Sequence, residues 1–263
     1  MRVDGLTGVH NVRDLGGIPV QGSREVVDSL FFRGGALSSA TDEDLNVLFN
    51  DRGIKCVIDL RCGWELEAKP NRVPASVEYL HIPFYDLEKV GIEYTESAEG
   101  TMVIGRDMAC VPDHFYRHIA NRLTTAQMRK ALDAILEHAL KGVPVYIHCS
   151  GGKDRAGIMS LVLLTVLGAE KDDIVEDYLL TNVSRDKRYE EMFERFYRFT
   201  GDAKQADELV ESHRARPENI DAFLQAIDEE YGSFDSFMID VLGMTDDRRK
   251  AVVAQLTRPR HDL

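Results

Sequence analysis

Residues 143–157 read VPVYIHCSGGKDRAG and lead directly into the apolar run IMSLVLLTVL of residues 158–167. Val145, Tyr146 and Ile147 have the β-branched and aromatic character of a buried strand. The apolar run is long and unbroken enough to form a buried helix. The pattern therefore predicts a strand, a tight turn and a helix, and the rest of the chain is interpreted around this unit.

The turn contains Cys149 and, six positions later, Arg155. A loop that closes from a strand into a helix can direct its backbone N–H groups inward around an anion, and the N-terminal end of the helix dipole adds positive charge. The planar guanidinium of Arg155 can bind two oxygens of a tetrahedral anion. These features predict a phosphate-binding loop of seven residues: Ser150, Gly151, Gly152, Lys153, Asp154, Arg155 and Ala156.

Cys149 is expected to lie at the floor of this loop. Inward N–H groups and the helix end favour a thiolate at neutral pH. A thiolate beneath a bound phosphate is a nucleophile directed at phosphorus. Phosphoryl transfer needs in-line geometry and donors for three equatorial oxygens, which the loop N–H groups and Arg155 would supply. His148 is expected to support the thiolate by hydrogen bonding.

The composition is that of an ordinary globular protein. The 263 residues are 44% hydrophobic and 29% charged, so we expect one domain over residues 1–263. The net charge of −13 argues against affinity for nucleic acid or an anionic membrane surface. The longest apolar run, residues 158–167, is too short to span a membrane, so no stable membrane insertion is expected. Four widely spaced cysteines fit a reducing compartment, and the first residues lack the apolar segment of a secretory signal. We therefore expect a cytoplasmic protein.

The loop sequence HCSGGKDRAG resembles the HC-x-x-GKDR-[ST]-G signature of a bacterial branch of the protein tyrosine phosphatase superfamily. This branch includes tyrosine, dual-specificity and lipid phosphatases. Further segments similar to that group follow in the same order along nearly the whole chain: NVRDLGG at 11–17, LFFRGGAL at 30–37, VIDLR at 57–61, IPFYDL at 82–87 and EEYGSFDSFM at 229–238.

The resemblance implies an α/β fold with a central, mostly parallel sheet flanked by helices. It also implies a phosphomonoester hydrolase that forms a cysteinyl-phosphate and uses neither a metal ion nor a cofactor. Phosphotyrosine, phosphoserine, phosphothreonine and phosphoinositides are the implied substrates, and a phosphate or sulfate ion is expected to bind in the loop. Two alternatives are a phosphatase for a nucleotide, sugar or inositol phosphate, and a phosphate-binding module without turnover.

Ala156 departs from the pattern, because the family usually has Ser or Thr at this position. In relatives that hydroxyl helps to stabilise the cysteine as the leaving group when the phosphoenzyme is hydrolysed. We expect its absence to slow the second chemical step more than the first.

Two aspartates are candidates for the acid that protonates the leaving oxygen. Asp86 follows the strand predicted at residues 77–84, and the resemblance puts an aspartate at this point near the active site. Asp154 lies inside the loop, where repulsion from the phosphate would favour its protonated, proton-donating form. The sequence does not choose between the two.

Other charged residues are assigned supporting roles. Asp59 and Arg61 come at the end of the strand predicted at residues 54–60, where ligands gather in open α/β sheets, but a structural role is favoured for Arg61 and Glu65. Near the N-terminus a salt-bridge network is preferred over direct phosphate contact for three residues: Arg13, Asp14 and Arg33.

Residues 184–216 are expected to form a helical insertion. The stretch 185–199 interleaves basic and aromatic residues, and the polar stretch 203–216 follows it. In the resembled group an insertion here forms a two-helix lid over the active site. Packed helices without a gating role are the alternative.

Other interpretations of the motifs are weaker. Lys153 suggests a nucleotide-binding P-loop, but Ile147 stands where the first glycine should be, and Asp154 where Ser or Thr should be. A persulfide site of rhodanese type does not require an arginine six residues after the cysteine. His114 and His118 have the i, i+4 spacing of metal ligands, but they lack an HExxH frame and a third ligand, so no metal site is expected.

Overall fold

The strand that precedes Cys149 lies in the middle of a central sheet. The computed structural model describes residues 2–84, 94–96, 102–104, 112–184 and 186–260. Within these ranges the central sheet has the spatial order β1 (Arg13–Asp14), β4 (Phe31–Gly34), β9 (Val145–His148), β5 (Cys56–Asp59) and β6 (Glu78–His81). Only β1 is antiparallel to its neighbour in this sheet. The predicted α/β fold with a mostly parallel sheet is confirmed.

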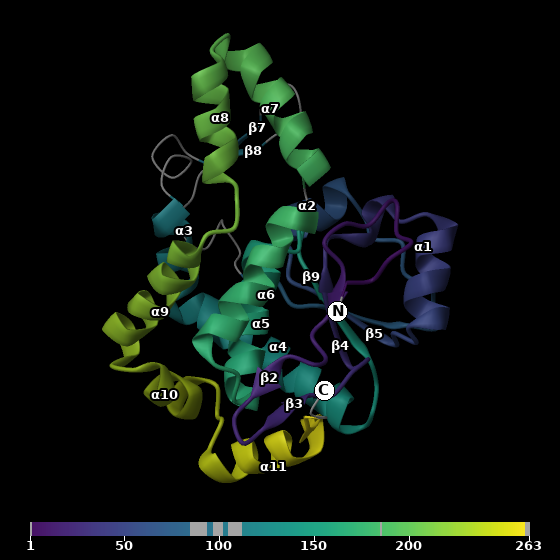
Figure 1. Cartoon of the computed structure of the whole chain (residues 1–263), viewed down its shortest axis with the longest axis vertical. Coiled ribbons are helices and arrows are strands. Elements are labelled where there is room, and N and C mark those ends of the chain that lie inside the picture. The colour runs from purple at the N-terminus through teal and green to yellow at the C-terminus, as the bar shows by residue number, and fades with distance from the viewer. Residues whose placement is uncertain (1, 85–93, 97–101, 105–111, 185, 261–263) are drawn as a thin grey trace.

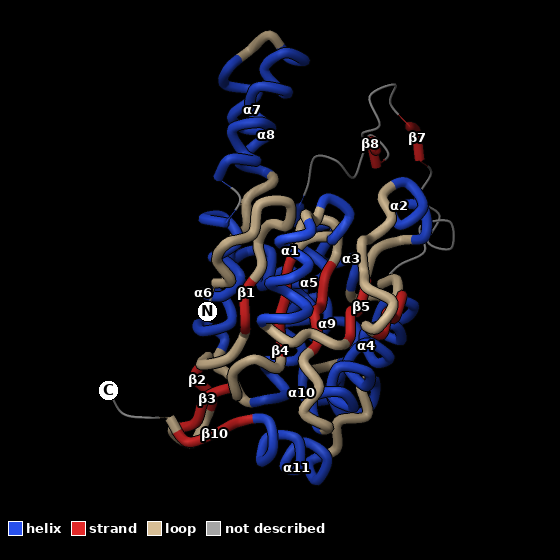
Figure 2. The backbone as a smooth tube through the Cα atoms, turned by 90° about the vertical axis from the view of Figure 1, so that its right-hand side faces the viewer, coloured by secondary structure: helices blue, strands red, loops and turns tan. Residues whose placement is uncertain are grey.

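Alternate residues of the three middle strands face two apolar cores. The larger core receives Phe31, Ile58 and Ile147. The smaller core receives Phe32, Val57 and Tyr146. Helices α4 (Arg122–Leu140) and α5 (Asp154–Leu167) pack on the strands from the side of the larger core, while α1 (Asp42–Asn46) lies on the other side of the sheet (Figure 1). That second side faces the viewer in Figure 2. Because both faces are covered, the strands are continuously apolar rather than alternating.

The remaining described elements surround this centre. The helices are α2 (Gly63–Ala68), α3 (Pro112–Ile119), α6 (Lys171–Ser184), α9 (Pro217–Tyr231), α10 (Phe234–Ser236) and α11 (Asp246–Leu256), with shorter helical turns η1 (Leu37–Ser39), η2 (Val47–Asp51) and η3 (Phe237–Val241). Two small sheets contain β10 (Thr257–Pro259), β3 (Arg24–Val26) and β2 (Pro19–Val20), and β7 (Tyr94–Glu96) with β8 (Met102–Ile104). Among these described helices, none has both the length and the apolar character needed to cross a lipid bilayer.

Helices α7 (Asp186–Thr200) and α8 (Ala203–Ser212) form a hairpin that projects from the rest of the molecule (Figure 1). The side chain of Asp202 caps α8 by accepting hydrogen bonds from the N–H groups of Lys204 and Gln205. The two helices expected in the insertion are therefore present, and the second ends four residues earlier than the stretch 203–216. Their role as a lid stays a prediction.

Candidate active site

Cys149 comes directly after β9, at the carboxyl end of the central sheet, and its side chain is buried. The chain then turns through residues 150–153 into α5, which begins at Asp154. Gly152 has a φ of 66°, and a Cβ built on it would lie 2.4 Å from the carbonyl carbon of Gly34. Only glycine fits, because the loop is pressed against the end of β4.

Hydrogen-bond donors hold the outer side of this loop. Asn11 Nδ2 donates to the carbonyl oxygens of Gly151 (3.2 Å) and Gly152 (3.0 Å). Arg33 Nη2 donates to the carbonyl oxygens of Gly152 (3.0 Å) and Lys153 (3.3 Å). A trans peptide directs its N–H opposite to its C=O, so these bonds turn the N–H groups of the same peptides toward the other side of the loop. Such successive N–H groups form an anion-binding concavity.

Arg33 belongs to a buried ion cluster with Arg13 and Asp177. Arg13 Nε lies 2.7 Å from Asp177 Oδ1, and Arg33 Nη1 lies 2.6 Å from Asp177 Oδ2. Burial raises the pKa of Asp177, but the two arginines outweigh it and hold this pKa below its ordinary value. Burial, followed by the charge of Arg13, lowers the pKa of Arg33 to about 10.

The expected N-terminal salt-bridge network is therefore present for Arg13 and Arg33. Its acid is Asp177 of α6, which sequence reasoning missed, because nothing local links position 177 to the N-terminal segment. Asp14 was expected in the network. Its carboxylate instead accepts hydrogen bonds from the backbone N–H groups of Gly16 (2.9 Å) and Ser29 (2.7 Å).

Arg155 forms a bidentate ion pair with Glu65 of α2. Arg155 Nη2 lies 2.8 Å from Glu65 Oε1, and Nη1 bonds to Oε2. The same carboxylate accepts from the hydroxyl of Ser150 and from the backbone N–H of Cys62 (2.9 Å). Burial raises the pKa of Glu65, but the charge and hydrogen bonds of Arg155 reverse the effect and lower it to about 2. Glu65 thus joins Ser150, the first residue of the loop, to Arg155 near its other end.

Sequence reasoning favoured a purely structural role for Glu65. One feature of the sequence could have indicated that Glu65 lies near the site. Glu65 follows Cys62 by three residues, so it is the N3 residue of α2, and this helix starts beside the carboxyl end of β5. The pairing with Arg155, 90 positions away, has no local signature.

His148 is fully buried beneath the loop. Asn71 Oδ1 accepts from the N–H of Leu37 (2.9 Å), so Asn71 Nδ2 is the donor to His148 Nε2 (3.1 Å). The hydrogen of the neutral ring then lies on Nδ1, which donates to the carbonyl oxygen of Cys149 (3.1 Å). Burial lowers the pKa of His148, although Asp59 opposes this shift. His148 therefore contacts Cys149 through the backbone.

Asp59 and Arg61 bind each other below the site. Arg61 Nη2 lies 2.7 Å from Asp59 Oδ2, and the hydroxyl of Tyr79 donates to the same oxygen at 2.6 Å. Asp59 and Arg61 are both buried, with exposed fractions of 0% and 1%. This geometry agrees with the structural role preferred for Arg61.

Asp154 lies at the first turn of α5, with its side chain 32% exposed. Its Oδ1 accepts a hydrogen bond from the hydroxyl of Tyr116 and lies 3.2 Å from Lys153 Nζ. The Lys153 ammonium also donates to the carbonyl oxygen of His213 (2.6 Å), in the segment that follows α8. Lys153 thus links the loop to the base of the α7–α8 hairpin. The other candidate acid, Asp86, lies outside the described residues.

Metal ligation was not expected, and the side chains of His114 and His118 lie outside the described part of the chain. Among the residues that are described, no group of three or more His, Cys, Asp or Glu side chains is arranged to hold a metal ion.

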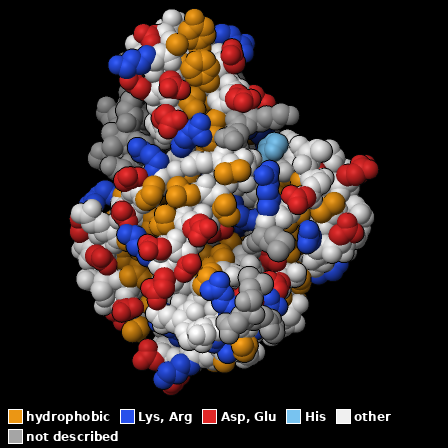
Figure 3. Space-filling view, in the orientation of Figure 1, with side chains coloured by type: hydrophobic (Ala, Val, Ile, Leu, Met, Phe, Trp, Pro, Cys, Tyr) orange, Lys and Arg blue, Asp and Glu red, His pale blue; other side chains and the backbone are white. Residues whose placement is uncertain are grey.

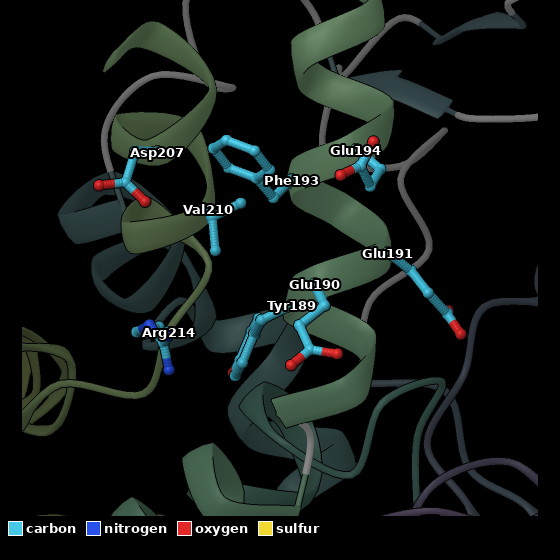
Figure 4. Close-up of a pocket in the computed structure, with 8 residues that line it drawn as sticks. All are labelled: Tyr189, Glu190, Glu191, Phe193, Glu194, Asp207, Val210 and Arg214. Carbon is cyan, nitrogen blue, oxygen red and sulfur yellow. The ribbon is translucent and has the colours of Figure 1, made fainter. Parts of the chain in front are cut away.

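A hollow of about 820 Å³ lies between α7 and α8 (Figure 4). Its lining combines an apolar floor with four acidic side chains and one arginine: Tyr189, Phe193, Val210, Glu190, Glu191, Glu194, Asp207 and Arg214. The guanidinium of Arg214 lies 4.6 Å from the ring centroid of Tyr189. Hydrophobic side chains also gather in a stripe along the face of the hairpin seen in Figure 3, where acidic and basic groups flank them.

Comparisons with known proteins agree with the motifs in the sequence. Residues 5–258 match the family model described as the tyrosine phosphatase family. The triple specificity protein phosphatase PtpB of Mycobacterium tuberculosis is 30% identical over 271 residues, which cover 91% of this chain and 94% of that protein. A tyrosine-protein phosphatase of Nostoc commune is 26% identical over 212 residues, covering 79% of this chain and 68% of that protein.

Among solved structures, the core catalytic domain of the PP-IP phosphatase SIW14 from S. cerevisiae matches with a TM-score of 0.38 and 14% identity. That match covers 67% of this chain and 78% of the yeast domain.

Proposed function

The chain belongs to the tyrosine phosphatase family and is a phosphatase, and we propose that it hydrolyses phosphomonoesters through a phosphate ester of Cys149. The observation that carries the proposal is the loop itself. A buried cysteine begins it, Asn11 and Arg33 bind its carbonyl oxygens from outside, and Arg155 closes it. This arrangement suits a phosphate dianion above the sulfur of Cys149.

In the first step Cys149 Sγ attacks phosphorus, the bond from phosphorus to the leaving oxygen breaks, and that oxygen takes a proton from a carboxylic acid. The loop N–H groups and Arg155 bind the three equatorial oxygens. In the second step water attacks phosphorus and gives a proton to the carboxylate formed in the first step, the bond from phosphorus to sulfur breaks, and the Cys149 thiolate and inorganic phosphate are released. We assign the acid to Asp154, because its carboxyl group is at the first turn of α5, in the loop that holds the phosphate. Asp86 is the other candidate.

Turnover of p-nitrophenyl phosphate in the presence of EDTA tests the mechanism. The wild-type enzyme should retain its activity, Cys149→Ser should abolish it, and Arg155→Lys should lower it sharply because lysine lacks the planar fork. Activity that survives in Cys149→Ser, or that requires a metal ion, would exclude the mechanism. Comparison of Asp154→Asn with Asp86→Asn, each on an ester with a poor leaving group, decides which carboxylic acid donates the proton.

Phosphotyrosine is the proposed first substrate, with phosphoserine, phosphothreonine and phosphoinositides as further ones. Support comes from PtpB, whose name states triple specificity and which aligns over 94% of its length. A panel of phosphopeptides, phosphoinositides and small phosphate esters, ranked by kcat/KM, tests this order. A soluble metabolite that exceeds every phosphopeptide by more than tenfold would favour the small-molecule alternative.

We also propose that residues 184–216 act as a lid on a single domain that spans residues 1–263. The bond from Lys153 to the carbonyl oxygen of His213 supports this, since it ties the base of the hairpin to the phosphate loop. Removal of residues 186–212 with a short linker should leave the fold intact and change KM for large substrates. Cys56, Cys62 and Cys149 are not joined in a disulfide within the described part of the chain, which supports a reducing, cytoplasmic location.

A further inference from the structure

Behind Asp154 lies a chain of buried polar side chains from three helices. Asn219 Nδ2 lies 3.0 Å from the hydroxyl oxygen of Tyr178, which lies 2.5 Å from the hydroxyl oxygen of Tyr116. The hydroxyl of Tyr116 in turn bonds to Asp154 Oδ1. Tyr116, Tyr178 and Asn219 are exposed by only 2%, 1% and 0%. Four groups separated widely in the sequence thus form one continuous path.

The hydrogens of this path can be counted. An ionised Asp154 only accepts hydrogen bonds, so Tyr116 donates to it. The hydrogen bond between the two tyrosine oxygens must then use the hydroxyl hydrogen of Tyr178, so Tyr178 donates to Tyr116. Tyr178 in turn accepts a hydrogen bond from Asn219 Nδ2. If the amide of Asn219 were rotated so that its oxygen accepted from Tyr178, the two tyrosine oxygens would face each other without a hydrogen between them.

The surroundings of Asn219 Oδ1 are consistent with hydrogen bonds that run from Asn219 toward Asp154. This oxygen is buried, and it has no hydrogen-bond partner among the residues that the structure describes. A buried carbonyl oxygen without a hydrogen-bond partner is energetically unfavourable. Among the described residues the path therefore leaves Asn219 Oδ1 without a hydrogen-bond partner, while the hydroxyl groups of Tyr178 and Tyr116 both donate in the direction of Asp154.

We propose that Tyr116 is a positioning residue for Asp154 in its role as the acid, and that Tyr178 and Asn219 fix the direction in which Tyr116 donates. The inference rests on the proposed function. When the O–H bond of Asp154 breaks and the O–H bond of the leaving group forms, Asp154 gains a full negative charge. A hydrogen bond to a charged acceptor is stronger than one to a neutral acceptor. Tyr116 therefore stabilises the transition state more than the ground state.

Two groups hold Oδ1 of Asp154 in place. Tyr116 donates a hydrogen bond to Oδ1, and Lys153 Nζ lies 3.2 Å from that same oxygen. Burial and the charge of Asp154 raise the pKa of Tyr116 well above its ordinary value, which keeps its hydroxyl protonated as a donor.

The dependence on the leaving group tests the role of Tyr116. A good leaving group such as p-nitrophenolate needs little protonation, whereas phenolate needs much more. Tyr116→Phe should lower kcat/KM for phenyl phosphate about tenfold and that for p-nitrophenyl phosphate by less than about threefold. Tyr178→Phe, which leaves Tyr116 in place, should give a smaller loss with the same dependence on the leaving group. Equal losses for the two esters in both variants would overturn the proposal.

A double-mutant cycle separates positioning from packing. In an Asp154→Asn background, Tyr116→Phe should cause no further loss on phenyl phosphate, because the group it acts through is gone. A further tenfold loss in that background would contradict the proposal. Tyr231→Phe is the matched control, since it removes a hydroxyl that bonds to Thr125 Oγ1 (3.0 Å) outside this path, and it should leave both kcat/KM values unchanged.

The experiments distinguish a failure of the role of Tyr116 from a failure of the proposed cysteine mechanism. Loss of all activity in Cys149→Ser, together with equal kinetics of Tyr116→Phe and wild type on phenyl phosphate, would retain the phosphatase and reject the role of Tyr116. Full activity in Cys149→Ser would reject the mechanism itself.

Discussion

Glu65 and Arg155 face each other with both carboxylate oxygens bonded to the two terminal nitrogens of the guanidinium, and Nη2 lies 2.8 Å from Oε1. The pair is nearly sealed from solvent, with side-chain exposures of 11% and 9%. A buried guanidinium held in this way loses little freedom when a phosphate binds. Glu65 is therefore expected to set the orientation of Arg155.

Replacement of Glu65 by Gln should lower kcat/KM about 10- to 100-fold, because loss of a charge-assisted pair costs roughly 1.5–3 kcal/mol. Since the pKa of Glu65 is lowered to about 2, the loss should be constant from about pH 5 to about pH 8. Steady-state kinetics on p-nitrophenyl phosphate check this. Glu67→Gln, at an exposed position of the same helix, is the control. Higher activity in Glu65→Gln would instead mean that Glu65 competes with phosphate for Arg155.

Asp177→Asn should destabilise the protein by roughly 3–5 kcal/mol, because it leaves the buried Arg13 and Arg33 without their countercharge. Urea unfolding at neutral pH measures the change. Glu176→Gln, exposed on the same helix, should change the free energy of unfolding by less than about 0.5 kcal/mol. Equal stability of the two variants would show that the cluster contributes little.

Asn11→Gly should weaken phosphate binding and lower kcat/KM about tenfold, because the carbonyl oxygens of Gly151 and Gly152 lose the hydrogen bonds from the Asn11 amide. Glycine suits the φ of 62° at this position, so the variant removes the amide without straining the backbone. Inhibition by inorganic phosphate gives the affinity. Ser23→Gly, at another left-handed position (φ 54°) in an exposed turn, should leave both quantities unchanged. An unaltered inhibition constant in Asn11→Gly would argue against support of the loop by Asn11.

His148 should make the free energy of unfolding fall as the pH drops below about 6.5. Burial lowers the pKa of His148 in the folded protein, so the unfolded chain takes up a proton that the folded chain does not. The slope from this group is at most about 1.4 kcal/mol per pH unit. Denaturant unfolding at about pH 5.5 and about pH 7.5 measures it. In His148→Asn this part of the slope should vanish, and an unchanged slope would contradict the assignment.

Ala156 should make hydrolysis of the phosphoenzyme the slow step. Rapid mixing with p-nitrophenyl phosphate is then expected to show a burst of product followed by a slower steady state. Ala156→Ser should raise the steady-state rate and reduce the burst, because a hydroxyl at this buried position can stabilise the departing thiolate. A wild-type time course without a burst, together with no acceleration in Ala156→Ser, would show that the missing hydroxyl does not limit turnover.

The sequence alone determined the strand, turn and helix around Cys149, since these depend on local pattern. The apolar run that predicts a buried helix lies within α5, and Val145, Tyr146 and Ile147, which predict a buried strand, lie within β9. The mostly parallel sheet also follows from strands that are apolar on both faces. The spacing of Cys149 and Arg155, together with the residues between them, is enough to indicate the family.

Tertiary structure decided which groups meet around that loop. Glu65 and Arg155 are 90 residues apart, Arg13 and Asp177 are 164 apart, and Tyr116 and Asp154 are 38 apart. Local periodicity reports only which face of a helix or strand is buried. A charged or hydroxyl side chain follows no such period, and its partner depends on how separate elements pack. For this reason the sequence could indicate Cys149 and Arg155, while the contacts of Glu65 with Arg155 and of Tyr116 with Asp154 emerged only from the fold.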